Sequence, residues 1–212
     1  MKTFNFIPLL YPLDIQRSLD FKDIFPDIHP IELELGAGDG SFITKIASQE
    51  TSKNFIAIER LLGRLKKIER FTKKNKLTNL CGMRHEISYV LRYLIPPSSI
   101  SKIHIYFPDP WPKKKHSRNR LFRPSMTRWL ARVLEPGGCV FVRTDNVPYF
   151  EQMKIVFMGD PEFTPIETPD YLKKIKTDFE CYFNKQGIET NYASFKWNPI
   201  SRSEIEDFTK QK

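Results

Sequence analysis

From about residue 31 the chain alternates short apolar runs with longer amphipathic segments, and this alternation constrains its fold more than any other feature. Continuous apolar runs predict buried strands, whereas apolar residues recurring every three or four positions predict helices. The expected strands cover 31–36, 53–59, 79–84, 100–107 and 139–144, and the expected helices cover 41–49, 60–75, a short segment ending at Leu94, and 124–134. Such alternation favours an α/β fold with a parallel sheet covered by helices on both faces.

The chain after the fifth expected strand is less regular. Residues 163–167 and 191–197 are candidates for an antiparallel pair that closes the mostly parallel sheet. A length of 212 residues fits one domain with a sizeable core. We therefore expect an N-terminal arm over 1–30, one domain over 31–197, and a polar C-terminal tail over 198–212.

The balance of charge is strongly basic. Lys+Arg number 34 against 25 Asp+Glu, which gives a net charge of +9 and a sequence pI near 9.4. Such a balance favours a polyanionic partner, and the alternative is a solvated basic surface without a partner. The apolar start of the chain is broken by Pro8 and Pro12 and is too short to span a bilayer, so no membrane is expected.

Cysteine and histidine usage indicates neither a disulfide framework nor a metal site. The three cysteines are far apart and form no C-x-x-C, and the four histidines show no metal-ligand spacing. This pattern suits a reducing cytoplasm, and no metal is expected.

The first expected strand runs into a glycine-rich turn that reads Glu34-Leu35-Gly36-Ala37-Gly38-Asp39-Gly40. Gly36 and Gly38 allow the backbone to approach a ligand closely. The third glycine comes one residue early for the G-x-G-x-x-G of dinucleotide sites. Glu34 would repel a pyrophosphate but favour a cationic ligand group. The alternative reading of Glu34 is a solvent-facing carboxylate at a strand end.

Two further acids follow expected strands. Glu59 ends the second strand, where a carboxylate accepts hydrogen bonds from both ribose hydroxyls of a nucleoside cofactor. That contact does not discriminate between NAD and S-adenosylmethionine. Glu86 follows the third strand and lies either near the adenine of such a cofactor or, as an alternative of equal weight, at an exposed helix start.

The most informative stretch begins where the fourth strand ends, with Asp109-Pro110-Trp111-Pro112. The prolines stiffen the loop that carries Asp109 and Trp111. Six cations follow within eleven residues: Lys113, Lys114, Lys115, Arg118, Arg120 and Arg123. Such a run neutralises backbone phosphates, and Trp111 is placed to stack on a base. The basic helix over 60–76 either extends this surface or is simply solvated.

The sequence resembles the bacterial tRNA (guanine-N7)-methyltransferases. The resemblance rests on LELGAGDGSF, on FIAIE and above all on FPDPWPKKKHSRNRL. It continues through Leu134 to Gly138, Arg143 to Asn146 and Thr177 to Glu180, and ends near Trp197. It implies a Rossmann-like class I fold, S-adenosylmethionine as cofactor with S-adenosylhomocysteine as product, and a tRNA partner. It also implies methylation of guanine N7 at position 46, in the variable loop.

The resemblance also implies roles for particular residues. Glu34, Gly36, Gly38, Glu59, Glu86 and Asp109 correspond to cofactor contacts, and Asp109 also to the proposed catalytic residue. Lys113, Asp145, Thr177, Asp178, Phe179 and Glu180 correspond to substrate contacts, and Lys115, His116, Ser117, Arg118, Asn119 and Arg120 to an RNA-binding segment. Position 86 is more usually Asp in that family, and the tail after Trp197 is longer than expected. The sequence does not give the oligomeric state.

Three other functions remain to be distinguished. Asp109-Pro110-Trp111 is similar to the motif of methyltransferases that act on the amino group of adenine, but it lacks a double proline. An NAD-dependent oxidoreductase is disfavoured by the glycine spacing and by Glu34. An RNA-binding module on an inactive methyltransferase fold is disfavoured by the intact acids at 34, 59, 109, 145 and 180.

Overall fold

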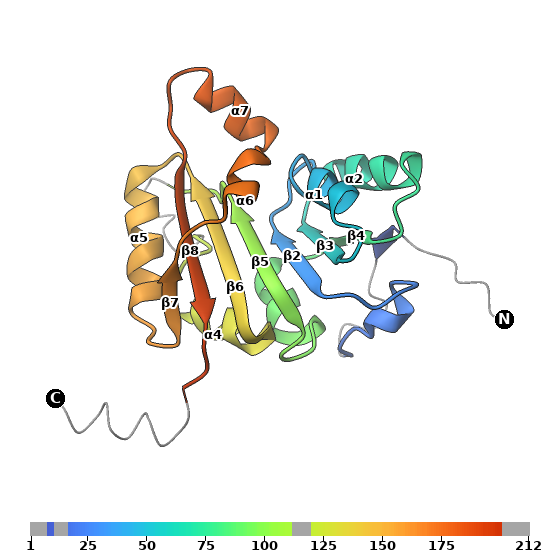
Figure 1. Ribbon diagram of the computed structural model, residues 1–212, viewed down its shortest axis with the longest axis horizontal. Helices are drawn as coiled ribbons and strands as arrows, with labels where there is room; N and C mark the ends of the chain where they lie inside the picture. Colours follow the sequence, from blue (N-terminus) through green and yellow to red (C-terminus); the bar gives the residue numbers. More distant parts are fainter. Residues whose placement is uncertain (1–7, 11–16, 112–119, 201–212) are drawn as a thin grey trace.

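The strands of this chain form one mixed sheet in the order β1-β4-β3-β2-β5-β6-β8-β7 (Figure 1). The computed structural model describes residues 8–10, 17–111 and 120–200. The strands are β1 (Leu9–Leu10), β2 (Ile31–Leu35), β3 (Asn54–Glu59), β4 (Leu80–Arg84), β5 (Ile100–Tyr106), β6 (Leu134–Thr144), β7 (Phe163–Ile166) and β8 (Asn191–Trp197). Pairing is parallel from β1 through β6, whereas β8 pairs antiparallel with both β6 and β7. The predicted parallel sheet with a closing antiparallel pair is therefore confirmed.

The helices cover both faces of this sheet (Figure 1). They are η1 (Phe21–Asp23), α1 (Ile43–Gln49), α2 (Leu62–Lys74), α3 (Ile87–Tyr89) continued by the π-helical turn η2 (Val90–Leu94), α4 (Ser125–Val133), α5 (Val147–Met158), α6 (Asp170–Lys174) and α7 (Asp178–Asn184). The four helices predicted before residue 135 are confirmed. The sequence analysis did not predict α5, α6 or α7. In α5, the exposed Ile155 and Met158 blur the contrast between its two faces, which hides the helical period.

Successive strand residues point into two separate cores. Leu33 and Leu35 of β2 face the core that α4, α5 and η2 cover. The opposite face of the sheet is covered by α1 and α2, and its core contains Phe42 and Leu65. Because side chains alternate along a strand, the acidic residues of β2 lie on this second face rather than in solvent.

Two local expectations need correction. Leu61 falls within the predicted helix 60–75, but it precedes α2 in an extended conformation and remains half exposed. The buried residues of α2 are Leu65, Ile68 and Thr72. The fifth strand was predicted to begin at residue 139, but β6 begins at Leu134 and includes Gly137 and Gly138. It shifts register against β5 after its first pair.

The described part of the N-terminal segment packs against the sheet. Leu9 and Leu10 add a parallel edge strand beside β4. The Leu19 backbone N–H donates to the carbonyl oxygen of Leu94, 2.8 Å away. The boundaries proposed for arm, domain and tail remain predictions. Within the described ranges, no helix combines the length and apolar character that crossing a bilayer requires.

Gly40 provides a test of the packing between the glycine turn and α2. Gly40 has φ +83°, and an added Cβ would lie 2.5 Å from Cγ1 of Ile68. We expect Gly40→Ala to lower the free energy of unfolding by about 2 kcal/mol or more, measured by urea denaturation. The matched control is Gly63→Ala in α2, where no described atom lies within 4 Å of the new Cβ. It should raise stability by roughly 0.5–1 kcal/mol, and equal effects of both changes would contradict this account of the turn.

Candidate active site

The sheet brings five acids singled out in the sequence to one edge. Parallel strands β4, β3, β2, β5 and β6 all end at this edge, beside α1 and α7 (Figure 1). Glu86, Glu59, Glu34, Asp109 and Asp145 lie in or directly after these five strand ends. The chain reverses its direction across the sheet between β2 and β5, which is where open α/β sheets bind ligands.

Glu59 holds the glycine turn against the end of β3. Its two carboxylate oxygens accept hydrogen bonds from the backbone N–H groups of Gly38, at 3.0 Å, and Leu61, at 2.8 Å. The N–H groups of Gly36 and Ala37 donate to the carbonyl oxygen of Ile58. Gly36 and Gly38 have φ of +79° and +57°, which L side chains rarely adopt. The turn is therefore fixed by hydrogen bonds, and the carboxylate of Glu59 retains acceptor capacity for a ligand.

Glu34 is a buried carboxylate with an unpartnered oxygen. Its side chain is 3% exposed, and no described atom forms a hydrogen bond with Oε2. The carboxylate also accepts from the backbone N–H of Ile43, at the start of α1. Burial raises the pKa of Glu34 to about 8, although the Arg143 guanidinium opposes this shift. The solvent-facing alternative for Glu34 is therefore wrong, and the buried oxygen is suited to a cationic donor.

Glu86 forms the N-cap of α3. Its carboxylate accepts from the backbone N–H groups of Ser88 and Tyr89, at 3.0 and 2.9 Å, and from the Ser88 hydroxyl. Burial alone would raise the pKa of Glu86, but these hydrogen bonds outweigh it and lower the pKa. The helix-start alternative explains the hydrogen bonds of both carboxylate oxygens. A ligand at this position would have to bind the same carboxylate that caps α3.

The loop after β5 is held in a strained conformation. Phe107 and Trp111 both have positive φ, at +50° and +42°. Arg120 donates from Nε to the carbonyl oxygen of Pro110, at 2.7 Å, and from its other nitrogens to Trp111 O and the Gln152 side chain. Asp109 is exposed and forms no hydrogen bond or ion pair with another described residue. Thus Arg120, expected in the RNA-binding segment, ties the Asp109 loop to α5.

The segment 177–180 lies beside the glycine turn, although it is far away in sequence. Thr177 caps α7 by accepting from the Glu180 N–H at 2.9 Å. The Asp178 N–H donates to the Ser41 hydroxyl at 3.1 Å, and Lys45 lies 3.4 Å from the Asp178 carboxylate. These contacts connect α7 to the start of α1.

The same segment supplies an exposed aromatic ring and a buried carboxylate. Phe179 is 47% exposed, and its ring centroid lies 5.0 Å from that of Phe107. Glu180 is fully buried. Phe179 and Glu180, which the resemblance grouped together as substrate contacts, therefore differ: one is exposed and the other is buried.

Arg143 is the main site-forming residue that the sequence analysis left without a role. It is 1% exposed and forms an ion pair with Glu180 across 3.0 Å. Its guanidinium also lies 4.0 Å from the centroid of the Tyr106 ring. One signal was visible in the sequence: Arg143 is the single charge in the otherwise apolar strand CVFVRT. A charge in a buried strand requires a partner, but the sequence does not identify which residue supplies it.

Some predicted residues lie outside the described ranges. These are Lys113, Lys115, His116, Ser117, Arg118 and Asn119. Asp145, for which a substrate contact was expected, is half-buried after β6 and, like Asp109, forms no hydrogen bond or ion pair with another described residue. Among the residues that the structure describes, no group of three His, Cys, Asp or Glu side chains is arranged to hold a metal ion.

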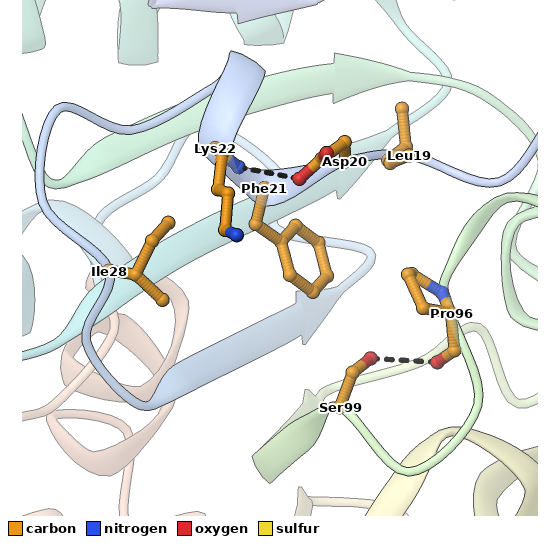
Figure 2. A pocket seen from close by; sticks show the side chains of 7 residues that line it. All are labelled: Leu19, Asp20, Phe21, Lys22, Ile28, Pro96 and Ser99. Atoms are coloured by element: carbon orange, nitrogen blue, oxygen red, sulfur yellow. Dashed lines mark hydrogen bonds between the residues drawn. The ribbon is translucent and has the colours of Figure 1, made fainter.

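A hollow of about 340 Å³ lies at the opposite edge of the sheet, before β2 and β5 begin. It is lined by Leu19, Asp20, Phe21, Lys22, Ile28, Pro96 and Ser99 (Figure 2). The Asp20 carboxylate accepts from the Lys22 backbone N–H, and the Ser99 hydroxyl donates to the Pro96 carbonyl oxygen. These polar groups are engaged within their own segments, so we assign the site to the carboxyl edge instead.

Comparisons with known proteins show to which family the chain is related. A family model described as "Putative methyltransferase" matches residues 28–192. A tRNA (guanine-N(7)-)-methyltransferase of Streptomyces avermitilis is 34% identical over 152 residues, which cover 71% of this chain and 52% of the relative. One from Bordetella pertussis is 36% identical over 145 residues, which cover 68% of this chain and 57% of that relative. This chain thus spans little more than half the length of these curated relatives.

Solved structures share the fold. The 16S rRNA methyltransferase KamB superposes with a TM-score of 0.64 over 87% of this chain and 96% of its own. Its sequence identity is 19%, so the likeness establishes the fold alone. The predicted Rossmann-like methyltransferase fold and the stated family resemblance are both confirmed.

The raised pKa of Glu34 predicts a pH dependence of stability. Between pH 4.5 and about 8 the folded protein binds a proton at Glu34 that the unfolded chain releases, so wild-type stability falls as pH rises through this window. Gln is neutral throughout. We expect Glu34→Gln to exceed wild type in free energy of unfolding by about 2 kcal/mol or more at pH 8, with the difference vanishing below pH 4.5.

Urea denaturation of both proteins at several pH values measures this difference. Glu151→Gln is the matched control, because the Glu151 carboxylate is 54% exposed on α5. Parallel pH profiles for wild type and Glu34→Gln would contradict the burial of an ionisable carboxyl at this position.

Proposed function

Since the chain belongs to the methyltransferase family whose model matches residues 28–192, we propose that it methylates N7 of a guanine in the variable loop of tRNA, position 46, using S-adenosylmethionine. One observation carries the proposal. The buried and unpartnered oxygen of Glu34 lies at a glycine turn, at the same sheet edge as the Asp109 loop. The similarity to two tRNA (guanine-N(7)-)-methyltransferases supports the choice of substrate and of reacting atom.

The residues of the turn fit S-adenosylmethionine. That molecule carries an ammonium group and, when bound, supplies a methyl group on a positively charged sulfur. Glu34 offers a buried acceptor that has no partner among the described residues, which suits the ammonium group. Gly36 and Gly38 leave the backbone of the turn open to close approach, and Glu59 offers carboxylate oxygens for ribose hydroxyls. Glu86 is our candidate for the residue that lies near the adenine of the cofactor.

The chemistry places modest demands on proton transfer. Guanine N7 carries a lone pair in the ring plane and no proton, so its methylation needs no general base. The task of the protein is then to position the base and to stabilise charge. Methylation leaves a positive charge on the imidazole ring of the base. Asp109 is our candidate for the carboxylate that stabilises it, because the strained loop presents it at the carboxyl edge without another described partner.

Selection of guanine is assigned to Asp145. A carboxylate there accepts hydrogen bonds from N1–H and the N2 amine of guanine, whereas adenine presents no N1–H. Asp145 follows β6, so the rigid sheet fixes its backbone. Lys113 and the segment 115–119 are proposed to bind the tRNA backbone, and Phe179 to pack against a base. Arg120 holds the Asp109 loop instead. We place the activity in the cytoplasm, where tRNA is used.

The proposal is tested by incubating the full chain with S-adenosylmethionine and unmodified tRNA transcripts. Mass spectrometry of the digested RNA then identifies the methylated nucleosides. We expect 7-methylguanosine, which disappears when the variable-loop guanine is replaced by adenine. A methyl group on the adenine amino nitrogen would favour the adenine-specific alternative. Binding of tRNA without any methylated product would favour the RNA-binding module.

Asp109→Asn tests the electrostatic role of the β5 loop. Removing the charge should lower kcat by at least tenfold while leaving the affinity for S-adenosylhomocysteine within about threefold. Single-turnover kinetics and isothermal titration calorimetry measure the two quantities. Asp160→Asn, in the turn at the opposite end of α5 from Asp145, is the control. Full turnover by Asp109→Asn would rule out charge stabilisation by this carboxylate.

A further inference from the structure

We propose that Glu180 is a positioning residue, and that its buried ion pair with Arg143 holds the segment 172–180 over the site. This inference rests on the proposed function and refines it. The resemblance placed Glu180 among residues that contact the substrate. The geometry points to a different task, in which Glu180 acts through Arg143 and does not touch the guanine.

Both oxygens of the Glu180 carboxylate are already engaged. Oε2 lies 3.0 Å from Nη1 of Arg143, and Oε1 accepts a hydrogen bond from the Tyr192 hydroxyl. Glu180 is 0% exposed. Because these partners cover the fully buried carboxylate, a guanine could reach it only by displacing one of them, and separation from Glu180 would leave an uncompensated buried charge on Arg143. Burial and the neighbouring Glu180 charge also raise the pKa of Tyr192 to about 12, so its hydroxyl remains a donor.

Arg143 extends this pair into a clamp on the chain before α7. Nη1 also donates to the carbonyl oxygen of Ile175, at 2.9 Å, and Nη2 donates to the carbonyl oxygen of Leu172. One guanidinium on β6 therefore holds the end of α6, the connection that follows it and the first turn of α7. Such a planar fork suits simultaneous hydrogen bonding to several fixed acceptors.

The clamp determines where the neighbouring side chains lie. The first turn of α7 places Phe179 against Phe107, on the loop that carries Asp109. It also places the Asp178 N–H against Ser41, beside the glycine turn. Arg143 itself stands two residues before Asp145 on the same strand end. Loss of the clamp should therefore displace Phe179 and the first turn of α7, although Glu180 itself does not contact the guanine.

The decisive experiment compares guanine analogues at the target position of the tRNA. Inosine lacks the N2 amine, and 2-aminopurine lacks the N1–H. We expect Glu180→Gln to lower kcat/KM for guanine at least tenfold and to lower it by the same factor for both analogues. A contact residue would instead lose its discrimination, so a collapse of the guanine preference in Glu180→Gln would overturn the proposal.

Paired substitution provides a second test that does not depend on how well a single variant folds. Buried ion pairs are often replaced by apolar side chains without loss of stability, whereas removal of one partner is costly. We expect Arg143→Met combined with Glu180→Leu to fold, because both buried charges are removed together. Its kcat/KM should nevertheless stay at least tenfold below wild type, because the double variant lacks the donors to the carbonyl oxygens of Leu172 and Ile175. Wild-type activity in a well-folded double variant would overturn the clamp.

Amide hydrogen exchange separates this inference from the proposed function. In Glu180→Gln the backbone amides of 172–184 should exchange at least tenfold faster, while those of β2 and β5 remain unchanged. Glu189→Gln is the matched control, since Glu189 is an exposed carboxylate in the loop before β8. Unchanged exchange in 172–184 would overturn the clamp even if 7-methylguanosine is formed. Faster exchange would support it even if the wild type methylates another base.

Discussion

The ion pair between Arg143 and Glu180 is the interaction on which the arrangement of the site depends. Both side chains are almost completely excluded from water, so each requires the other. The pair joins β6 to a segment more than thirty residues further along the chain. It also holds the Arg143 guanidinium where its positive charge lowers the pKa of Glu34 and so opposes the effect of burial. Charges buried on one face of the sheet thus couple Glu34, at the glycine turn, to the segment 172–180.

A second buried polar cluster lies on the same face of the sheet, beside the apolar side chains that α1 and α2 cover. Glu32 and His104 form a buried hydrogen bond of 2.9 Å, and the His104 ring also contacts the Tyr106 hydroxyl. Burial would raise the pKa of Glu32, but His104 and nearby lysines outweigh it and hold the pKa at about 2. The apolar core on the other face supplies the rigid support. Buried polar side chains that hydrogen-bond to one another in this way are each held in one orientation.

The division between predictable and unpredictable features follows the range of the interactions. The buried strands were predicted because they are continuous apolar runs, a local signal. The α5–α7 region was not predicted, because α6 and α7 are short and exposed apolar residues such as Ile155 blur the helical period of α5. Their positions depend on distant contacts, such as the one between Asp178 and Ser41. Local patterns carry no information about such contacts.

The sequence by itself determined the α/β alternation, the glycine turn, the family and the set of acids at the strand ends. Those features are local in the chain, or follow from the rule that parallel strands end at one edge. Only the tertiary structure decided what each acid does there. Glu34 is buried with a free oxygen, Glu86 caps a helix, and Glu180 is engaged by Arg143. The state of a carboxylate depends on its burial and its partners, and folding brings those together from distant parts of the chain.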